Sequence, residues 1–149
     1  MAKSETVSNI LNNSRTIAVV GLSPKPHRAS FGVSRYMQAQ GYRIIPINPN
    51  TTEVFGQKAY ASLTEAARHE KIDLVNCFRN SEDIPPIVDE AIAIGAKAVW
   101  MQLGIEHPAA AAKAKAAGLQ VVQDQCIKVD HTVLLSRGLV ASPAALNDR

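Results

Sequence analysis

The length of 149 residues favours one domain, long enough to bury a core without disulfides or a structural metal. The composition, 46% hydrophobic and 19% charged, fits a soluble globular protein, and a net charge of +3 without a Lys/Arg block gives no reason to expect a nucleic-acid partner. No apolar run approaches the ~18 residues of a membrane span, and the N-terminus lacks a secretory signal, so we expect a cytoplasmic protein without membrane contact.

Short β-branched runs alternate with helical patterns along the chain. Val7, Ile10 and Leu11 predict a helix within residues 1–15. The predicted strands that follow are residues 17–20, 43–47, 72–77, 98–101 and 119–122. The predicted helices between and after them are residues 30–40 (capped by Ser30), a short one after Ser62, 81–94 (starting close to Pro85 and Pro86), 108–117 and 127–135.

Five alternations of strand and helix predict an α/β fold in one domain. The strands are apolar without strict two-residue alternation, which is typical of a parallel sheet covered by helices on both faces. We therefore predict a doubly wound five-stranded parallel sheet over residues 16–135, an N-terminal helix before it, and a loose tail over residues 136–149. In such folds a ligand binds at the carboxyl ends of the strands.

The loop after the first predicted strand, residues 21–30, carries the strongest functional signal. Free backbone N–H groups at a helix N-terminus attract anions, and Lys25, His27 and Arg28 add positive charge. We interpret the loop as a phosphate site, although a solvated turn would have the same residues. Gly21 is the one glycine at the turn, so the GxGxxG fingerprint of dinucleotide-binding proteins is absent.

The second predicted strand ends without a carboxylate. Proteins that bind NAD usually place Asp or Glu there to hold the ribose hydroxyls, whereas this chain has Asn48 and Pro49. Classical NAD binding therefore loses support. A proline offers flat apolar surface to an adenine ring, and a neutral Asn tolerates a nearby phosphate. The alternative, that Pro49 only turns the chain, fits the sequence equally well.

Two later strand ends supply further candidate contacts. Phe78 could cover a base or a pantetheine arm, and Arg79 could bind a phosphate or brace its own loop through carbonyl groups. Gln102 is placed to point into the loop region and contact a ligand amide. Trp100 lies inside a predicted strand, so we expect it in the core.

The sequence contains no catalytic constellation and no metal-binding pattern. Cys77 and Cys126 form no CxxC pair, so we expect free thiols and no zinc site. The chain has four histidines but no GxSxG motif, and no His lies in a nucleophile pattern. We expect His107 to cap a helix and His69 to be exposed. Asp124 and Cys126 remain as candidates for chemistry, with an inert thiol the favoured interpretation of Cys126.

Five ordered segments carry a resemblance to a known family. They are GLSPKPHRASFGVSRYM, GYRIIPINP, DLVNCFRNSEDIPPIVDEAI, AVWMQLGI and VVQDQCIKVDH. Together they resemble the small single-domain CoA-binding proteins, which are similar to the CoA-binding domain of the succinyl-CoA synthetase α subunit. The resemblance covers residues 16–131 and implies a Rossmann-like fold that binds coenzyme A, or an acyl-CoA, across the strand ends.

The resemblance also implies where the ligand lies. The turn at Gly21 would surround the phosphates, Asn48 would lie near the adenosine, and Phe78 would line the rest of the site. The implied cofactor-binding residues are Gly21, Leu22, Ser23, Lys25, Arg28, Ser30, Asn48, Pro49, Phe78, Arg79, Met101, Gln102, Leu103 and Gly104. The synthetase carries its phosphorylated histidine in a second domain, and no residue here matches it, so ligase activity is not implied.

Three hypotheses of function follow from the sequence. The first is non-catalytic binding of CoA or an acyl-CoA, in a carrier, sensor or regulatory role. The second is an NAD(P)-dependent enzyme or NAD(P)-binding regulator, in which Lys25 and Arg28 would hold a 2′-phosphate. The third is a regulatory subunit whose ligand gates binding to a protein partner. The sequence indicates neither the acyl group nor the oligomeric state.

Overall fold

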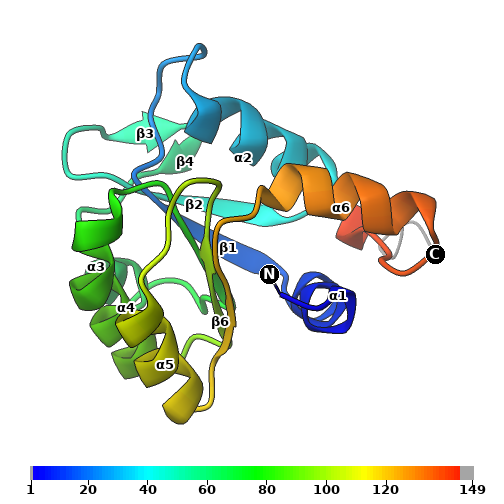
Figure 1. Cartoon of the computed structure of the whole chain (residues 1–149). Helices are drawn as coiled ribbons and strands as arrows, with labels where there is room; N and C mark the ends of the chain where they lie inside the picture. Colours follow the sequence, from blue (N-terminus) through cyan, green and yellow to red (C-terminus); the bar gives the residue numbers. More distant parts are fainter. Residues whose placement is uncertain (1, 145–149) are drawn as a thin grey trace.

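A parallel sheet of five strands forms the centre of the computed structural model, which describes residues 2–144 (Figure 1). Its strands are β1 (Thr16–Val20), β2 (Arg43–Ile47), β5 (Leu74–Cys77), β6 (Ala98–Met101) and β7 (Gln120–Val122). They lie in the order β2-β1-β5-β6-β7, and every neighbouring pair is parallel. The predicted sheet is confirmed, with β5 and β7 starting slightly later than expected.

Helices cover both faces of this sheet, as the doubly wound pattern predicts. The helices are α1 (Ser4–Asn13), α2 (Ala29–Ala39), α3 (Leu63–Ala66), α4 (Ile84–Ala93), α5 (Pro108–Ala116) and α6 (Ile127–Ser136). α1, α2 and α6 pack on one face, and α3, α4 and α5 pack on the other (Figure 1). Each face buries its own apolar cluster, with Trp100 fully buried in the first. No described helix is long and apolar enough to span a membrane.

Local capping signals in the sequence are confirmed. The Ser62 hydroxyl accepts a hydrogen bond from the Glu65 backbone N–H at 3.1 Å, at the start of α3. His107 caps α5 in the same way, because its Nδ1 accepts from the Ala110 N–H at 3.1 Å. Gly41, which follows the C-cap residue Gln40 of α2, has a φ of +101°, a left-handed conformation that favours glycine.

Two helix starts differ from the prediction. α2 begins at Ala29 with Arg28 at the N-cap position, so Ser30 is not the cap. Its hydroxyl instead accepts the N–H of Ser23 at 3.0 Å, which ties the preceding loop to the helix. The helix expected from residue 81 opens as a 3-10 turn, Ser81–Asp83, and α4 then starts at Ile84 with prolines in its first turn.

The segment after β2, read as a loop from the sequence, contains a small hairpin. Strands β3 (Glu53–Val54) and β4 (Gln57–Lys58) pair antiparallel around a turn at Phe55 and Gly56. Both turn residues have positive φ, +57° and +74°, which matches the twist of a tight hairpin. Each strand has only two residues, which is too few for an alternation of apolar and polar residues to be recognised in the sequence.

The C-terminal segment is packed where the structure describes it, which corrects the expectation of a loose tail. Val140 and Ser142 are buried. The Ala141 N–H donates to Asn12 Oδ1 at 3.1 Å, and the Ser142 hydroxyl donates to Gln40 Oε1 at 2.8 Å. These contacts hold the segment against α1 and α2. Residues 145–149 of the predicted tail lie outside the described residues.

His131 on α6 connects that segment to the core. Its ring is fully buried, with Nδ1 2.8 Å from the Tyr36 hydroxyl and Nε2 3.2 Å from the Ser142 hydroxyl. Because the Ser142 proton goes to Gln40, Ser142 accepts from His131 Nε2, and Nδ1 is left to accept from Tyr36. This arrangement suits the neutral ring, and burial lowers the pKa of His131 below its ordinary value of 6.5.

We predict that acid destabilises the fold through His131. In the unfolded chain this ring becomes protonated near its ordinary pKa of 6.5. In the folded protein the ring stays neutral to a lower pH. The free energy of unfolding is therefore expected to fall as the pH decreases from 7 through the folded-state pKa. Urea denaturation at pH 7 and pH 5 checks this. His131→Gln is expected to flatten the slope, because glutamine does not titrate in this pH range. An identical slope in His131→Gln would contradict the account.

Candidate functional site

The carboxyl ends of β1 and β5 frame a cavity of about 370 Å³. After β1 the chain proceeds to β2 on one side, and β5 is then added on the other side of β1. The chain therefore continues from β1 to a helix on one face of the sheet and from β5 to a helix on the other, which is the geometry of a ligand crevice in doubly wound sheets. The residues that line the cavity are Gly21, Ser23, Lys25, Arg28, Ala29, Ser30 and Phe78.

The N-terminus of α2 gives this cavity a positive potential. The N–H groups of Ala29 and Ser30 have no backbone carbonyl partner among the described residues, as expected for a first helical turn. Lys25 and Arg28 are exposed beside them, and neither forms an ion pair within residues 2–144. Helix dipole and side-chain charge therefore act in the same direction, and both favour an anion.

Hydrogen bonds hold the β1–α2 loop in this shape. The Gly21 N–H donates to the Ile47 carbonyl at 2.9 Å, and the Lys25 N–H donates to the Ser23 hydroxyl at 3.1 Å. From β2, Asn48 Nδ2 donates to the Leu22 carbonyl at 2.9 Å. The predicted adenosine residue Asn48 therefore braces the predicted phosphate loop.

Gly21 sits where no side chain fits. Its φ is +88°, and a Cβ built on it would lie 2.6 Å from the Phe78 carbonyl oxygen and 3.0 Å from Arg79 Cδ. The first contact is with backbone, which cannot rotate away as a side chain can. Glycine at this position thus lets the loops after β1 and β5 approach each other.

The structure brings six of the predicted binding residues into this one cavity: Gly21, Ser23, Lys25, Arg28, Ser30 and Phe78. The sequence did not single out Ala29, which lines the cavity at the first position of the helix. His27 is exposed but does not line it.

Three other predicted residues have buried side chains. Leu22 and Met101 belong to the two apolar clusters, one on each face of the sheet. Gln102 is 3% exposed, donates from Nε2 to Asn76 Oδ1 at 2.6 Å, and accepts the Ile127 N–H at 3.4 Å. Contact between its side chain and a ligand amide would require these bonds to break.

The remaining predicted residues lie at strand ends outside the cavity. Arg79 forms an ion pair with Asp83 at 3.8 Å in its own loop, and Pro49 is exposed after β2. The Gly104 N–H donates to Asp124 Oδ1 at 2.6 Å, which links the loops after β6 and β7.

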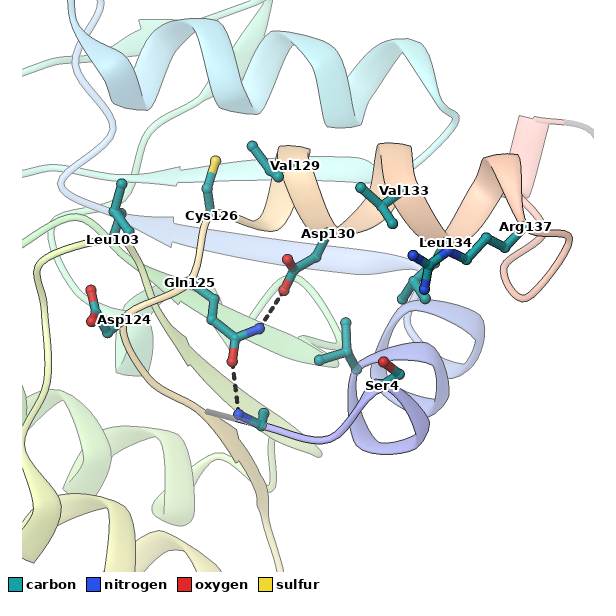
Figure 2. Close-up of a pocket in the computed structure, with 12 residues that line it drawn as sticks. Ser4, Leu103, Asp124, Gln125, Cys126, Val129, Asp130, Val133, Leu134 and Arg137 are labelled. Atoms are coloured by element: carbon teal, nitrogen blue, oxygen red, sulfur yellow. Dashed lines mark hydrogen bonds between the residues drawn. The ribbon is translucent and has the colours of Figure 1, made fainter.

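Leu103, the last of the predicted residues, lines a second cavity of about 360 Å³ (Figure 2). This cavity lies between α1, α6 and the loops after β6 and β7, and Cys126 also lines it. Sequence reasoning did not find its apolar wall, which Val129 and Val133 form on α6. Their spacing of four residues places them on one helical face, and that was the available signal.

Comparison with known proteins identifies the family. A model of the CoA binding domain matches residues 15–132. The chain belongs to this family. It is 44% identical over 127 residues to the uncharacterized protein YneT of Bacillus subtilis, a match that covers 85% of this chain and 93% of that protein.

Solved structures agree with this assignment. A hypothetical protein from Pyrococcus horikoshii is 36% identical, with a TM-score of 0.85, over 90% of this chain and 93% of that one. A dinucleotide-forming acetyl-coenzyme A synthetase from Ca. Korarchaeum cryptofilum shares the fold, with a TM-score of 0.66 at 22% identity, over 77% of this chain and 27% of that one. The predicted Rossmann-like fold and family are thus confirmed.

We predict that Gly21→Ala destabilises the protein by roughly 1–3 kcal/mol, because it forces a left-handed residue with a Cβ against backbone. Gly32→Ala is the matched control. Gly32 lies inside α2 with nothing within 4 Å of a built Cβ, so alanine there should stabilise the helix by about 1 kcal/mol. Urea denaturation measures both. Equal effects of the two substitutions would contradict the close approach at Gly21.

Proposed function

We propose that this chain is a cytoplasmic protein that binds coenzyme A or an acyl-CoA without catalysing a reaction, in a carrier, sensor or regulatory role. The observation that carries the proposal is the cavity at the start of α2. The backbone N–H groups of Ala29 and Ser30 and the cations Lys25 and Arg28 lie around it, and within residues 2–144 the N–H groups have no carbonyl partner and the cations no ion pair. The family's CoA binding domain supports the choice of ligand.

The proposed contacts follow from charge and shape. The CoA diphosphate would lie at the N-terminus of α2, against Ser23, Lys25 and Arg28. The helix N–H groups and the two cations stabilise an anion most strongly at this point. The adenosine would lie towards the end of β2, where the exposed Pro49 offers apolar surface and no carboxylate repels a phosphate. The pantetheine arm would run past Phe78 towards the loop after β6.

The lining of the cavity supports binding without catalysis. The described residues around it include no His, Cys, Asp or Glu. A serine hydroxyl becomes a nucleophile only beside a general base, and here the Ser30 hydroxyl already accepts the Ser23 N–H. The site is therefore suited to holding an anion rather than to activating a nucleophile or transferring a proton.

We predict measurable binding of CoA to the purified protein, and weaker binding of NAD and NADPH. The absence of an acidic residue at the end of β2 removes the usual partner of the NAD ribose. Isothermal titration calorimetry with the three compounds checks this. Tight NADPH binding without CoA binding would overturn the proposal in favour of the NAD(P) hypothesis.

We predict that Arg28→Ala weakens CoA binding by about tenfold at low salt, equivalent to ~1.4 kcal/mol for one charge-assisted contact. The loss should be smaller at high salt, because the Debye length shrinks from ~30 Å at 0.01 M to ~3 Å at 1 M. Arg35→Ala, at an exposed position of the same helix outside the cavity, is the matched control. A loss that is equal at both salt concentrations would show that Arg28 acts through packing.

A further inference from the structure

The second cavity is an apolar groove that remains open to solvent. We call it the α1–α6 groove and define it by Val7, Leu103, Cys126, Val129, Val133 and Leu134. Leu103 is 72% exposed, Val129 is 56% exposed and Val133 is 41% exposed. These are three of the five large hydrophobic side chains that the described residues expose, and all three line this one groove. Such clustering is typical of a binding surface.

Three polar side chains that line the groove, Asp124, Gln125 and Asp130, take part in hydrogen bonds. Gln125 accepts the Ala2 N–H at 2.8 Å and donates to Asp130 Oδ2 at 2.5 Å, which connects the residue before α1 to α6 (Figure 2). The Asp124 carboxylate accepts the Gly104 N–H. A hydrocarbon occupant would therefore leave these hydrogen bonds in place. The charged residues that line the groove are Asp124, Asp130 and Arg137, so its charge is mixed.

The end of the groove at Leu103 and Cys126 lies along the same edge of the sheet as the cavity at the N-terminus of α2 (the α2 cavity). Leu103 follows β6, and β6 is two strands away from β1, which is about 10 Å in a parallel sheet. Phe78, which lines the α2 cavity, follows β5, the strand between them. A ligand anchored by its diphosphate at α2 and extended along this edge passes Phe78 and then reaches Leu103 and Cys126.

We propose that the α1–α6 groove binds the hydrocarbon chain of an acyl-CoA whose diphosphate lies at the N-terminus of α2. This inference rests on the proposed function and adds the class of ligand, a fatty acyl thioester of CoA. The thioester carries no charge, so the chain enters the groove without bringing an anion to Asp124 and Asp130. A free fatty acid lacks the diphosphate that anchors the acyl-CoA at α2, so it should bind more weakly. The volume of about 360 Å³ is within the range of small-molecule sites.

Calorimetry with CoA and decanoyl-CoA tests the inference. Each fully buried methylene contributes roughly a fourfold gain in affinity, so a partly buried chain should bind at least about tenfold tighter than CoA. Val129→Asp and Val133→Asp should remove this gain and leave CoA binding unchanged. Leu135→Asp is the matched control, since Leu135 is exposed on the same helix but does not line the groove.

Thiol labelling provides a second readout at the groove itself. Cys77 is fully buried, and burial raises the pKa of its thiol to about 12, so a maleimide should modify Cys126 first. Decanoyl-CoA at saturation should slow labelling of Cys126 at least several-fold more in the wild-type protein than in Val133→Asp. Decanoate alone, at the same concentration, should not protect it.

The outcomes separate the two proposals. If CoA binds but decanoyl-CoA binds no more tightly, the groove inference is overturned and CoA binding stands. If neither binds, the proposed function fails as well. If sedimentation shows a dimer that Val133→Asp dissociates, and decanoyl-CoA gains nothing, a second copy of the chain occupies the groove and the inference is overturned. Preferential binding of decanoate by itself would also overturn it.

Discussion

The close approach of two loops at Gly21 is the constraint on which the site depends. The turn after β1 donates from its first N–H to the end of β2 and lies against the Phe78 carbonyl at the end of β5. Only a residue without a side chain fits between them. This turn leads directly to the start of α2. The close approach at Gly21 therefore determines where the helix N-terminus and the cations before it lie. The cavity exists because three strand ends converge on one glycine.

The two faces of the sheet have different roles. The cavity at the N-terminus of α2 and the α1–α6 groove both lie on the face that α1, α2 and α6 cover. On that face α6 contributes apolar residues to the groove and also carries the buried His131, which holds the C-terminal segment against α2. The stability of the fold and the shape of the proposed acyl site therefore share one helix.

The sequence predicted the fold well because its signals are local. Glycines after helices, Ser62 and His107 as caps, and uninterrupted apolar strands each act over a few residues, and the structure confirms them. The cationic loop before α2 was recognisable for the same reason. The role of Gln102 was not, because it depends on Asn76 on a neighbouring strand. The role of Ser30 was not either, because it depends on how the β1–α2 loop folds to bring the Ser23 N–H to its hydroxyl. The apolar groove requires α1 and α6 to meet, which no window of sequence contains.

The central claim is that the N-terminus of α2 holds the diphosphate of CoA. Backbone amide chemical shifts report on this contact at single residues. Titration of the ¹⁵N-labelled protein with CoA should produce its largest shift changes at Gly21, Ser23, Ala29 and Ser30, with smaller changes at Phe78 and Leu103. Adenosine 3′,5′-bisphosphate, which lacks the diphosphate and the pantetheine arm, should shift these four amides much less. Large changes confined to the α3–α5 face, or no change at residues 21–30, would contradict the account.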